Sequence, residues 1–344
     1  MNLDSRIFVA GHRGLVGSAI LQTLKYKGYK NIITKTKDEL DLRDFDKVSA
    51  FFENNNIDIV ILAAAKVGGI MANNIYRADF IYENIAIQNN VIFNAYKYHI
   101  KKLLFLGSSC IYPKYAKQPM SEDCLLSGEL EYTNEPYAIA KIAGLKMCES
   151  YAIQYGCNFI SVMPTNLYGN NDNFDLQDSH VLPALIRKMY LAKCLENNDI
   201  QAIKADLGEN YKEILDRFNI TKNSVEVWGS GNVRREFLHS LDMAKACIFI
   251  MENVDFKDLA TSKNNEIRNT HINIGYGSDI TIRDLAFLIK NIVGFSGKIV
   301  FNTNKPDGTP QKLLDISKLK KLGYSPSITL EDGIKEVYKN YKNR

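Results

Sequence analysis

Tyr137 and Lys141, spaced four residues apart, are the residues whose types and spacing most directly suggest chemistry. If residues 135–141 open a helix, both side chains lie on the same face, one turn apart. A tyrosine loses its proton near pH ~10, so it is a poor acid or base at neutral pH unless a cation lowers its pKa. Lys141 can supply that cation. The same spacing also occurs on ordinary surface helices, so its meaning depends on the rest of the chain.

A serine at the end of a predicted strand extends this group. Residues 102–107 form an apolar strand that leads into Ser108, and the helix with Tyr137 and Lys141 follows. A hydroxyl, a phenol and an ammonium together are suited to moving a proton to or from a carbonyl or alcohol oxygen. The hydride for such a reaction must come from a nicotinamide.

A glycine loop near the start of the chain predicts where that nicotinamide dinucleotide binds. Residues 7–10 read as a strand and residues 18–21 as the start of a helix, and the loop between them has the spacing GxxGxxG. Glycines there allow a tight turn and close approach of the backbone to a pyrophosphate. The spacing is one residue longer than the usual fingerprint, so the flanking strand and helix carry the prediction. The loop residues are Gly11, His12, Arg13, Gly14, Leu15, Val16 and Gly17.

Cations after the second predicted strand favour NADPH over NADH. That strand, residues 31–34, is followed by Lys35 and Lys37, where an NAD-binding site usually has an acidic residue for the ribose hydroxyl. Arg13 adds a third cation, and a 2′-phosphate would bind all three. The alternative is that Lys35 and Lys37 are simply solvated. Asp41 or Leu42 is expected near the adenine.

The alternation of strands and helices predicts an α/β fold with a Rossmann doubly wound parallel sheet. The strand at 58–65 is continuously apolar, as in a sheet covered on both faces, and Ala63 and Ala64 leave room for a ligand at its end. We expect residues 1–169 to form the dinucleotide-binding domain, with 236–253 returning to it. Residues 170–235 and 254–344 are expected to form a smaller C-terminal α/β substrate-binding lobe.

Composition excludes several other classes of protein. The 344 residues are 46% hydrophobic and 24% charged, and the net charge of +4 comes from scattered lysines, which argues against a nucleic-acid surface. No apolar run is long enough to span a bilayer or to act as a signal peptide, so we expect a cytoplasmic protein without membrane contact. The six cysteines lack CxxC pairs and the five histidines lack HxH or HxxxH spacing, so no disulfide framework or metal site is expected.

Short motifs through nearly the whole chain carry a family resemblance. With them, the chain resembles the extended short-chain dehydrogenases/reductases and, within that superfamily, the GDP-L-fucose synthase family. The matching segments are residues 10–14, 16–20, 62–70, 107–114, 133–141, 163–169, 179–181, 235–239 and 305–310.

The resemblance implies a reaction on a GDP-linked 4-keto-6-deoxy sugar, with NADPH reducing the C4 ketone. Tyr137 would donate the proton, Lys141 would lower the phenol pKa and bind the nicotinamide ribose, and Ser108 would hydrogen-bond the sugar oxygen. Cys110 and His180 match the base and acid that epimerise C3 and C5. From the residues alone, a cysteine after a strand is also typical of a small buried side chain, and His180 could cap the helix it precedes.

The same resemblance assigns further contacts and a homodimer. Contacts to NADPH are implied for Ala63, Ala64, Leu106, Gly107, Lys141, Pro164, Thr165, Asn166, Leu167 and His180. Contacts to the GDP-sugar are implied for Ser109, Asn166, Lys188, Trp228, Arg235 and Asp307. An arginine that clamps a diphosphate and a flat indole face suit such a ligand.

Residues 194–224 are longer than is typical of that family and predict an inserted segment with a helix at 210–218. The insertion could alter substrate choice or assembly, or it could be a solvated excursion. It keeps open a related enzyme that reduces a GDP-4-keto-6-deoxy-heptose without epimerisation. A second alternative is a non-catalytic NADPH-binding subunit, against which Ser108, Tyr137 and Lys141 argue.

Overall fold

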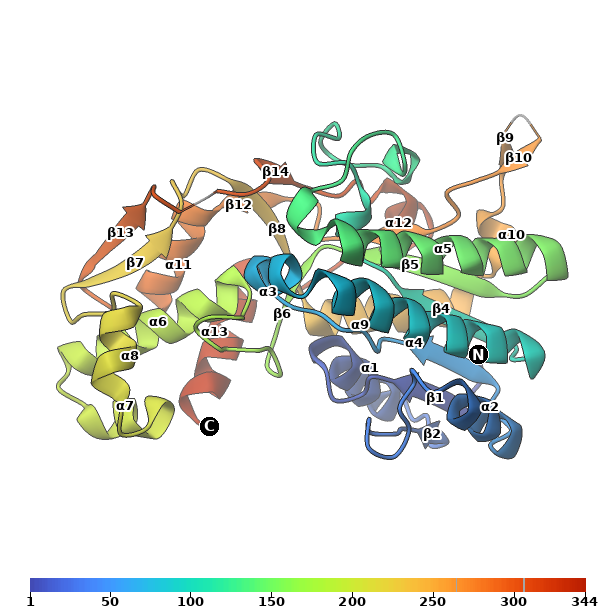
Figure 1. The fold of residues 1–344 in the computed structure, drawn as a ribbon, viewed down its shortest axis with the longest axis horizontal. Helices are drawn as coiled ribbons and strands as arrows, with labels where there is room; N and C mark the ends of the chain where they lie inside the picture. Colours follow the sequence, from blue (N-terminus) through green and yellow to red (C-terminus); the bar gives the residue numbers. More distant parts are fainter. Residues whose placement is uncertain (264, 306) are drawn as a thin grey trace.

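The computed structural model describes residues 1–263, 265–305 and 307–344, and its largest element is a six-stranded parallel sheet. The strand order is β2-β1-β3-β4-β5-β11, and Figure 1 labels β1, β2, β4 and β5 of this sheet. The strands are β1 (Ile7–Ala10), β2 (Ile32–Ile33), β3 (Ile59–Leu62), β4 (Lys102–Leu106), β5 (Phe159–Pro164) and β11 (Ile272–Ile274). Their register pairs Ala10 with Leu62, and Leu62 with Phe105, so the carboxyl ends of these strands meet at one edge. The predicted doubly wound fold is confirmed.

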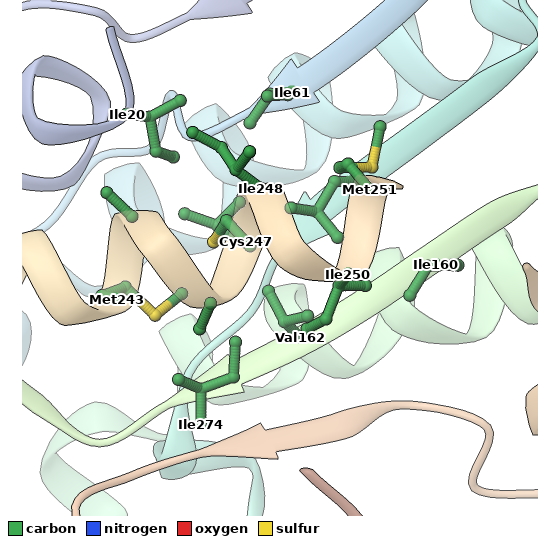
Figure 2. Close-up of a cluster of buried hydrophobic side chains, with 14 of the residues drawn as sticks. Ile20, Ile61, Ile160, Val162, Met243, Cys247, Ile248, Ile250, Met251 and Ile274 are labelled. Atoms are coloured by element: carbon green, nitrogen blue, oxygen red, sulfur yellow. The ribbon is translucent and has the colours of Figure 1, made fainter. Parts of the chain in front are cut away.

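Helices cover both faces of this sheet, which is why its strands are apolar on both sides. On one face lie α1 (Leu15–Tyr26) and α9 (Ser240–Asn253), and on the other α2 (Phe45–Asn54), α4 (Arg77–Lys97) and α5 (Glu135–Tyr155). Figure 2 shows Ile248 of α9 pointing toward Ile20 of α1 and Ile61 of the sheet, and Ile250 pointing toward Val162. Each layer therefore buries a separate hydrophobic core.

The helix that carries Tyr137 and Lys141 is α5, and its sequence explains its position. Pro136 lies in its first turn, where a missing N–H costs nothing. Further along, a Cβ on Gly144 would lie 2.5 Å from the ring of Phe105, so only glycine lets α5 approach β4 this closely. Gln88 of α4 donates a 2.7 Å hydrogen bond to the Ala140 carbonyl and fixes the other side.

The smaller lobe contains a second sheet (Figure 1), and its buried side chains form a third core. In this sheet β8 (Arg234–His239) pairs with β6 (Asn166–Tyr168), β12 (Asp279–Thr281) and β14 (Gln311–Lys312). A separate ladder joins β7 (Ser224–Trp228) to β13 (Lys298–Asn302). The helices that share the third core are α6 (Val181–Glu196), α7 (Ile200–Leu207), α8 (Tyr211–Arg217), α11 (Ile282–Val293) and α13 (Leu330–Lys342).

Some segments belong to a different part of the molecule, the large-sheet domain or the lobe, than the sequence predicted. In the segment 236–253, α9 packs on the large sheet, whereas β8 belongs to the lobe. Conversely, β11 lies in the range expected for the lobe but is the edge strand of the large sheet, and α12 (Ser317–Lys321) packs beside it. In the described residues, no helix is both long and apolar enough to cross a membrane.

Replacing Ile248 with alanine tests the core between α9 and the large sheet. The side chain is 1% exposed, so Ile248→Ala should lower the free energy of unfolding by about 2–5 kcal/mol, measured by urea denaturation. Ile75 on α3 (Ile70–Ile75) is 62% exposed and provides the matched control, with an expected change within ~0.5 kcal/mol. Equal losses in the two variants would contradict this assignment of the core.

Candidate active site

A cleft of about 1250 Å³ lies along the carboxyl edge of the large sheet and is also lined by residues of the lobe. It brings together most of the residues predicted from the sequence. Those that line it are Gly11, Gly14, Leu15, Val16, Gly17, Lys35, Lys37, Asp41, Leu42, Ala63, Ala64, Leu106, Gly107, Ser108, Ser109, Cys110, Tyr137, Lys141, Pro164, Thr165, Asn166, Leu167, His180, Lys188, Trp228, Arg235 and Asp307. His12 and Arg13 are not among the described lining residues, and Arg13 is exposed.

The glycine loop has the close contacts that a dinucleotide-binding turn requires. Gly11 has φ +86°, and a Cβ there would lie 2.6 Å from the Ala64 nitrogen. A Cβ on Gly17 would lie 2.1 Å from the Gly11 carbonyl oxygen. Gly14 begins α1 without a side-chain cap, which leaves N–H groups of the first turn available to an anion. The loop therefore fits a pyrophosphate.

Cationic side chains lie at the ribose end of the cleft, but two of them are paired with carboxylates. Lys35 and Lys37 line the cleft, as does Arg43, which was not predicted. The guanidinium of Arg43 lies 2.6 Å from Asp41 and 3.1 Å from Glu83. The hydrogen bond from Arg43 lowers the pKa of Asp41 to about 2. Arg43 is therefore held by carboxylates, and the ammonium of Lys35 lies 3.6 Å from Glu39. Lys37 has no ion pair among the described residues, so it is the best placed of the three to meet a phosphate.

Ser108, Tyr137 and Lys141 meet where β4 ends beside α5. The Lys141 ammonium donates a 2.8 Å hydrogen bond to the Leu106 carbonyl and lies 5.8 Å from the centroid of the Tyr137 ring. Burial lowers the pKa of Lys141 to about 7. Burial and then the charge of Cys110 raise the pKa of Tyr137 well above its usual value, and a hydrogen bond with Ser108 opposes this shift. A lowering of the phenol pKa by Lys141 stays a prediction.

Cys110 is held in the cleft by two hydrogen-bond donors. It lies in the short 3-10 helix Ser109–Ile111, and its amide donates to the Ser108 hydroxyl at 3.2 Å. Its sulfur accepts from the Asn134 side-chain amide at 3.5 Å and from the Lys312 ammonium at 3.7 Å. Unlike Cys148 and Cys247, which are buried in the cores, Cys110 is partly exposed. The alternative of a small core residue therefore does not hold.

His180 occupies the N-cap position of α6 but makes no side-chain capping hydrogen bond. Its ring lines the cleft instead. Although part of its surface faces the open cleft, the surrounding protein lowers the pKa of His180, and the charge of Lys312 lowers it further. Capping by the imidazole therefore does not explain this residue.

Charged side chains also lie at the lobe end of the cleft. Burial lowers the pKa of Lys188 to about 8, and its ammonium donates a 3.0 Å hydrogen bond to the Glu226 carbonyl. Burial also lowers the pKa of Arg235, whose guanidinium donates to the Arg234 carbonyl at 2.8 Å. Desolvated cations of this kind are well suited to bind an anionic group.

Trp228 is the last residue of β7, and Asp307 lies in the loop that follows β13. Trp228 is 45% exposed, and Lys305 lies 5.1 Å from the centroid of its ring system. The Asp307 carboxylate accepts hydrogen bonds from the Ser230 amide at 2.7 Å and from the Ser230 hydroxyl at 2.8 Å. Asp307 thus fixes the loop after Trp228. Pro306, part of the predicted motif 305–310, lies outside the described residues.

The inserted segment is helical and contacts the cleft region. Asp206 of α7 lies 2.7 Å from Arg187 of α6, and Arg187 also donates to the Phe174 carbonyl at 3.1 Å. Leu215 of α8 is buried. The ring centroid of Phe218, the C-cap residue of α8, lies 5.8 Å from the Lys188 ammonium. The segment therefore supports the loop before His180 and the residues around Lys188, rather than forming a solvated excursion.

Among the polar cleft residues that were not predicted as site residues are Lys312, Asn134 and Lys66. Asn134 stands within the motif 133–141, which was a signal for it, and its side-chain oxygen is buried without a partner among the described residues. Lys66 lies 2.5 Å from Glu83. Lys312 is 202 positions from Cys110, and no sequence pattern links the two. In the part of the chain that the structure describes, no group of three or more potential metal ligands occurs.

The fold and the site define a dinucleotide-binding α/β protein with an acid–base group at the end of its fourth strand. Residues 7–275 match the family described as the NAD dependent epimerase/dehydratase family. A GDP-L-fucose synthase of Escherichia coli (strain K12) is 51% identical over 333 residues, which are 97% of this chain and 95% of that protein. The chain belongs to the NAD dependent epimerase/dehydratase family, and its resemblance to the GDP-L-fucose synthases is confirmed.

Two solved structures from Campylobacter jejuni are similarly close. A GDP-6-OMe-4-keto-L-xylo-heptose reductase has a TM-score of 0.96 at 49% identity, covering 100% of this chain and 99% of that one. A GDP-mannoheptose C4 reductase with NADP bound has a TM-score of 0.90 at 48% identity, covering 99% of each chain. The sequence identity of this chain to the fucose synthase is therefore about the same as its identity to the heptose reductases, so identity does not distinguish between these two kinds of relative.

Asp172, in the loop that leads to His180, provides a test by pH. One carboxylate oxygen is buried without a partner in the described structure, and burial raises the pKa of Asp172 to about 7. The charged carboxylate lowers the stability of the folded protein. This loss of stability is absent below about pH 4, where the carboxyl is protonated in both the folded and the unfolded protein, and it is complete above about pH 7. Asp172→Asn should therefore raise the free energy of unfolding by about 1–3 kcal/mol near pH ~8 and by less near pH ~5.

Urea denaturation at the two pH values measures this effect. Asp178 is an exposed carboxylate in the same loop, so Asp178→Asn should change stability by less than ~0.5 kcal/mol at either pH. If the free energy of unfolding of Asp172→Asn is not raised near pH ~8, the folded loop accommodates the charged carboxylate and the prediction is wrong.

Proposed function

We propose that the protein is an NADPH-dependent enzyme that reduces the C4 ketone of a GDP-4-keto-6-deoxy sugar and epimerises C3 and C5, giving GDP-L-fucose or a close relative. The observation that carries this proposal is that Ser108, Tyr137, Lys141 and Cys110 line the same cleft as the glycine loop. The names of the fucose synthases and heptose reductases that the chain resembles support the class of substrate.

Binding of NADPH by this chain rests on the glycine loop and the two lysines. The first turn of α1 would hold the pyrophosphate, and Lys35 with Lys37 would hold the 2′-phosphate. Lys141, fixed to the Leu106 carbonyl, would hold the nicotinamide ribose. When bound, NADPH supplies the hydride that reduces C4.

Protonation of the new alcohol is assigned to Tyr137. Its raised pKa keeps the proton on the phenol until negative charge develops on the sugar oxygen. Ser108, which opposes the rise in the pKa of the phenol, would donate to the same oxygen and orient it. This pair converts the ketone oxygen to a hydroxyl without releasing a free alkoxide.

Epimerisation is assigned to Cys110 and His180. A proton next to a ketone is acidic enough for a thiolate to remove it, leaving an enolate whose charge lies on the C4 oxygen. An imidazolium can then return a proton to the opposite face of the carbon. The GDP group would be bound at the lobe end, where Lys188 and Arg235 can pair with the diphosphate and Asp307 supports the loop beside Trp228.

Assembly and location form a further part of the proposal. Exposed apolar residues lie on the adjacent helices α4 and α5, among them Tyr82 (70% exposed), Ile153 (49%) and Tyr155 (50%). A homodimer through these helices would cover them. The six free cysteines suit the reducing environment of the cytoplasm.

A C4 reductase of a GDP-4-keto-6-deoxy-heptose that lacks epimerase activity is the second candidate. The heptose reductases among the solved relatives and the inserted helices beside Lys188 favour it. Cys110 and His180, both in the cleft, favour epimerisation. A non-catalytic NADPH-binding subunit would have no use for the arrangement of Ser108, Tyr137 and Lys141.

Removal of one hydroxyl tests the reduction step. Tyr137→Phe should lower the rate of NADPH oxidation by roughly 10²–10⁴-fold because the proton donor is lost, while NADPH affinity measured by fluorescence stays within about twofold. Tyr132→Phe is the matched control, since Tyr132 is 68% exposed and should retain full activity. If Tyr137→Phe still supports the biological role of the protein, the non-catalytic alternative replaces this proposal.

Solvent deuterium tests the epimerisation. With the GDP-4-keto-6-deoxy sugar in D₂O, the product should carry deuterium at C3 and C5, and Cys110→Ser should lower this incorporation by roughly 10²-fold or more. Cys157→Ser, which replaces another partly exposed free cysteine, should leave it unchanged. A wild-type enzyme that turns over without incorporating deuterium would be the C4 reductase of the second candidate.

A further inference from the structure

The sulfur of Cys110 lies between two hydrogen-bond donors that come from distant parts of the chain. The Asn134 side-chain amide, just before α5, lies 3.5 Å away, and the Lys312 ammonium, from β14, lies 3.7 Å away. Among the described residues, no carboxylate lies within ion-pair distance of Lys312. The positive charge of Lys312 is therefore directed at the sulfur rather than neutralised by the protein.

The backbone on either side of Lys312 is fixed, so this lysine is not a loose surface side chain. In the ladder between β8 and β14, Lys312 stands opposite Arg235. The next amide, Leu313, donates to the Gln118 side chain at 2.8 Å. The amide after it, Leu314, donates at 3.1 Å to Glu236, a carboxylate that is fully buried. Lys312 therefore reaches the cleft from a rigid edge of the lobe sheet.

The chemistry proposed for Cys110 needs this charge. The nucleophilic and basic form of cysteine is the thiolate, and nearby cations are what favour it over the thiol. Arg235 is another cation near the sulfur, but its guanidinium also donates to the Arg234 carbonyl. The amide of Asn134 adds a neutral donor that orients the sulfur.

We infer that Lys312 is a positioning residue which, together with Asn134, holds the sulfur of Cys110 as a thiolate directed at the sugar, so that epimerisation depends on Lys312. This inference rests on the proposed function. In the step that it supports, the C–H bond next to the ketone breaks, its proton passes to the sulfur, and the electron pair moves to the C4 oxygen as an enolate. The ammonium of Lys312 keeps its own protons throughout.

The alternative role for this ammonium is an ion pair with the diphosphate of the ligand. The two roles differ in the free protein, because only the first changes the reactivity of Cys110 when no ligand is present. A diphosphate contact would instead raise the KM for the GDP-sugar and leave the free thiol unaffected.

Alkylation of the free protein by iodoacetamide, followed at each cysteine by peptide mass spectrometry, is the direct test. Lys312→Met should slow alkylation of Cys110 about tenfold or more near pH ~7, and Lys312→Arg should restore much of the rate. Cys157, partly exposed at the far end of α5, is the internal control and should react at the wild-type rate in every variant. Unchanged alkylation of Cys110 in Lys312→Met would overturn the inference.

The same variants connect the thiol to the reaction. Deuterium incorporation at C3 and C5 should fall about tenfold or more in Lys312→Met and recover in Lys312→Arg, while NADPH affinity stays the same. Slower alkylation with unchanged incorporation would also overturn the inference. If the wild-type protein incorporates no deuterium, the proposed epimerisation fails, whereas the alkylation result still decides whether Lys312 controls Cys110. Lys312→Gln replaces Lys312→Met if circular dichroism shows that the methionine variant does not fold.

Discussion

The hydrogen bond from the Lys141 ammonium to the Leu106 carbonyl is the interaction on which the site depends. It joins α5 to the end of β4 at 2.8 Å, in a place where burial lowers the pKa of the lysine to about 7. Because the Lys141 ammonium is anchored on β4, Tyr137, one turn earlier in α5, is directed at the residues that follow β4. The close packing of Gly144 of α5 against the ring of Phe105 of β4 also makes the contact between Lys141 and Leu106 possible. A buried cation, a strand end and a helix thus position the acid–base group together.

Residues of the large sheet and residues of the lobe together form the cleft. The carboxyl ends of β1 and β4 provide the glycine loop and Ser108, but β8 and β14 bring Arg235 and Lys312 to the same cleft. Cys110 lies where the two parts meet, with Asn134 on one side and Lys312 on the other. The proposed mechanism separates two tasks: it assigns reduction to residues of the large sheet, and epimerisation to Cys110 together with residues of the lobe.

The sequence predicted most of the fold, because its signals are local. The glycine loop between β1 and α1, the apolar β3 and the long helices α4 and α5 follow from residues that are close together in the chain. The role of β11 in the large sheet could not be predicted in this way, since three residues carry no distinctive pattern and their pairing with β5 is a long-range contact. The same holds for β14, with two residues. Arg13, expected at the ribose, is exposed and outside the cleft lining of the described structure, since the turn of the loop decides which side chains face the ligand.

Incubation with NADPH and GDP-4-keto-6-deoxy-mannose, with NADPH consumption followed by absorbance and the product identified by NMR, tests the central claim most directly. The account predicts that NADPH is consumed and that the product is GDP-L-fucose, which requires reduction at C4 and inversion at both C3 and C5. An unepimerised GDP-6-deoxy sugar, or turnover only with the corresponding heptose, would contradict it and identify the protein as a C4 reductase of the related type.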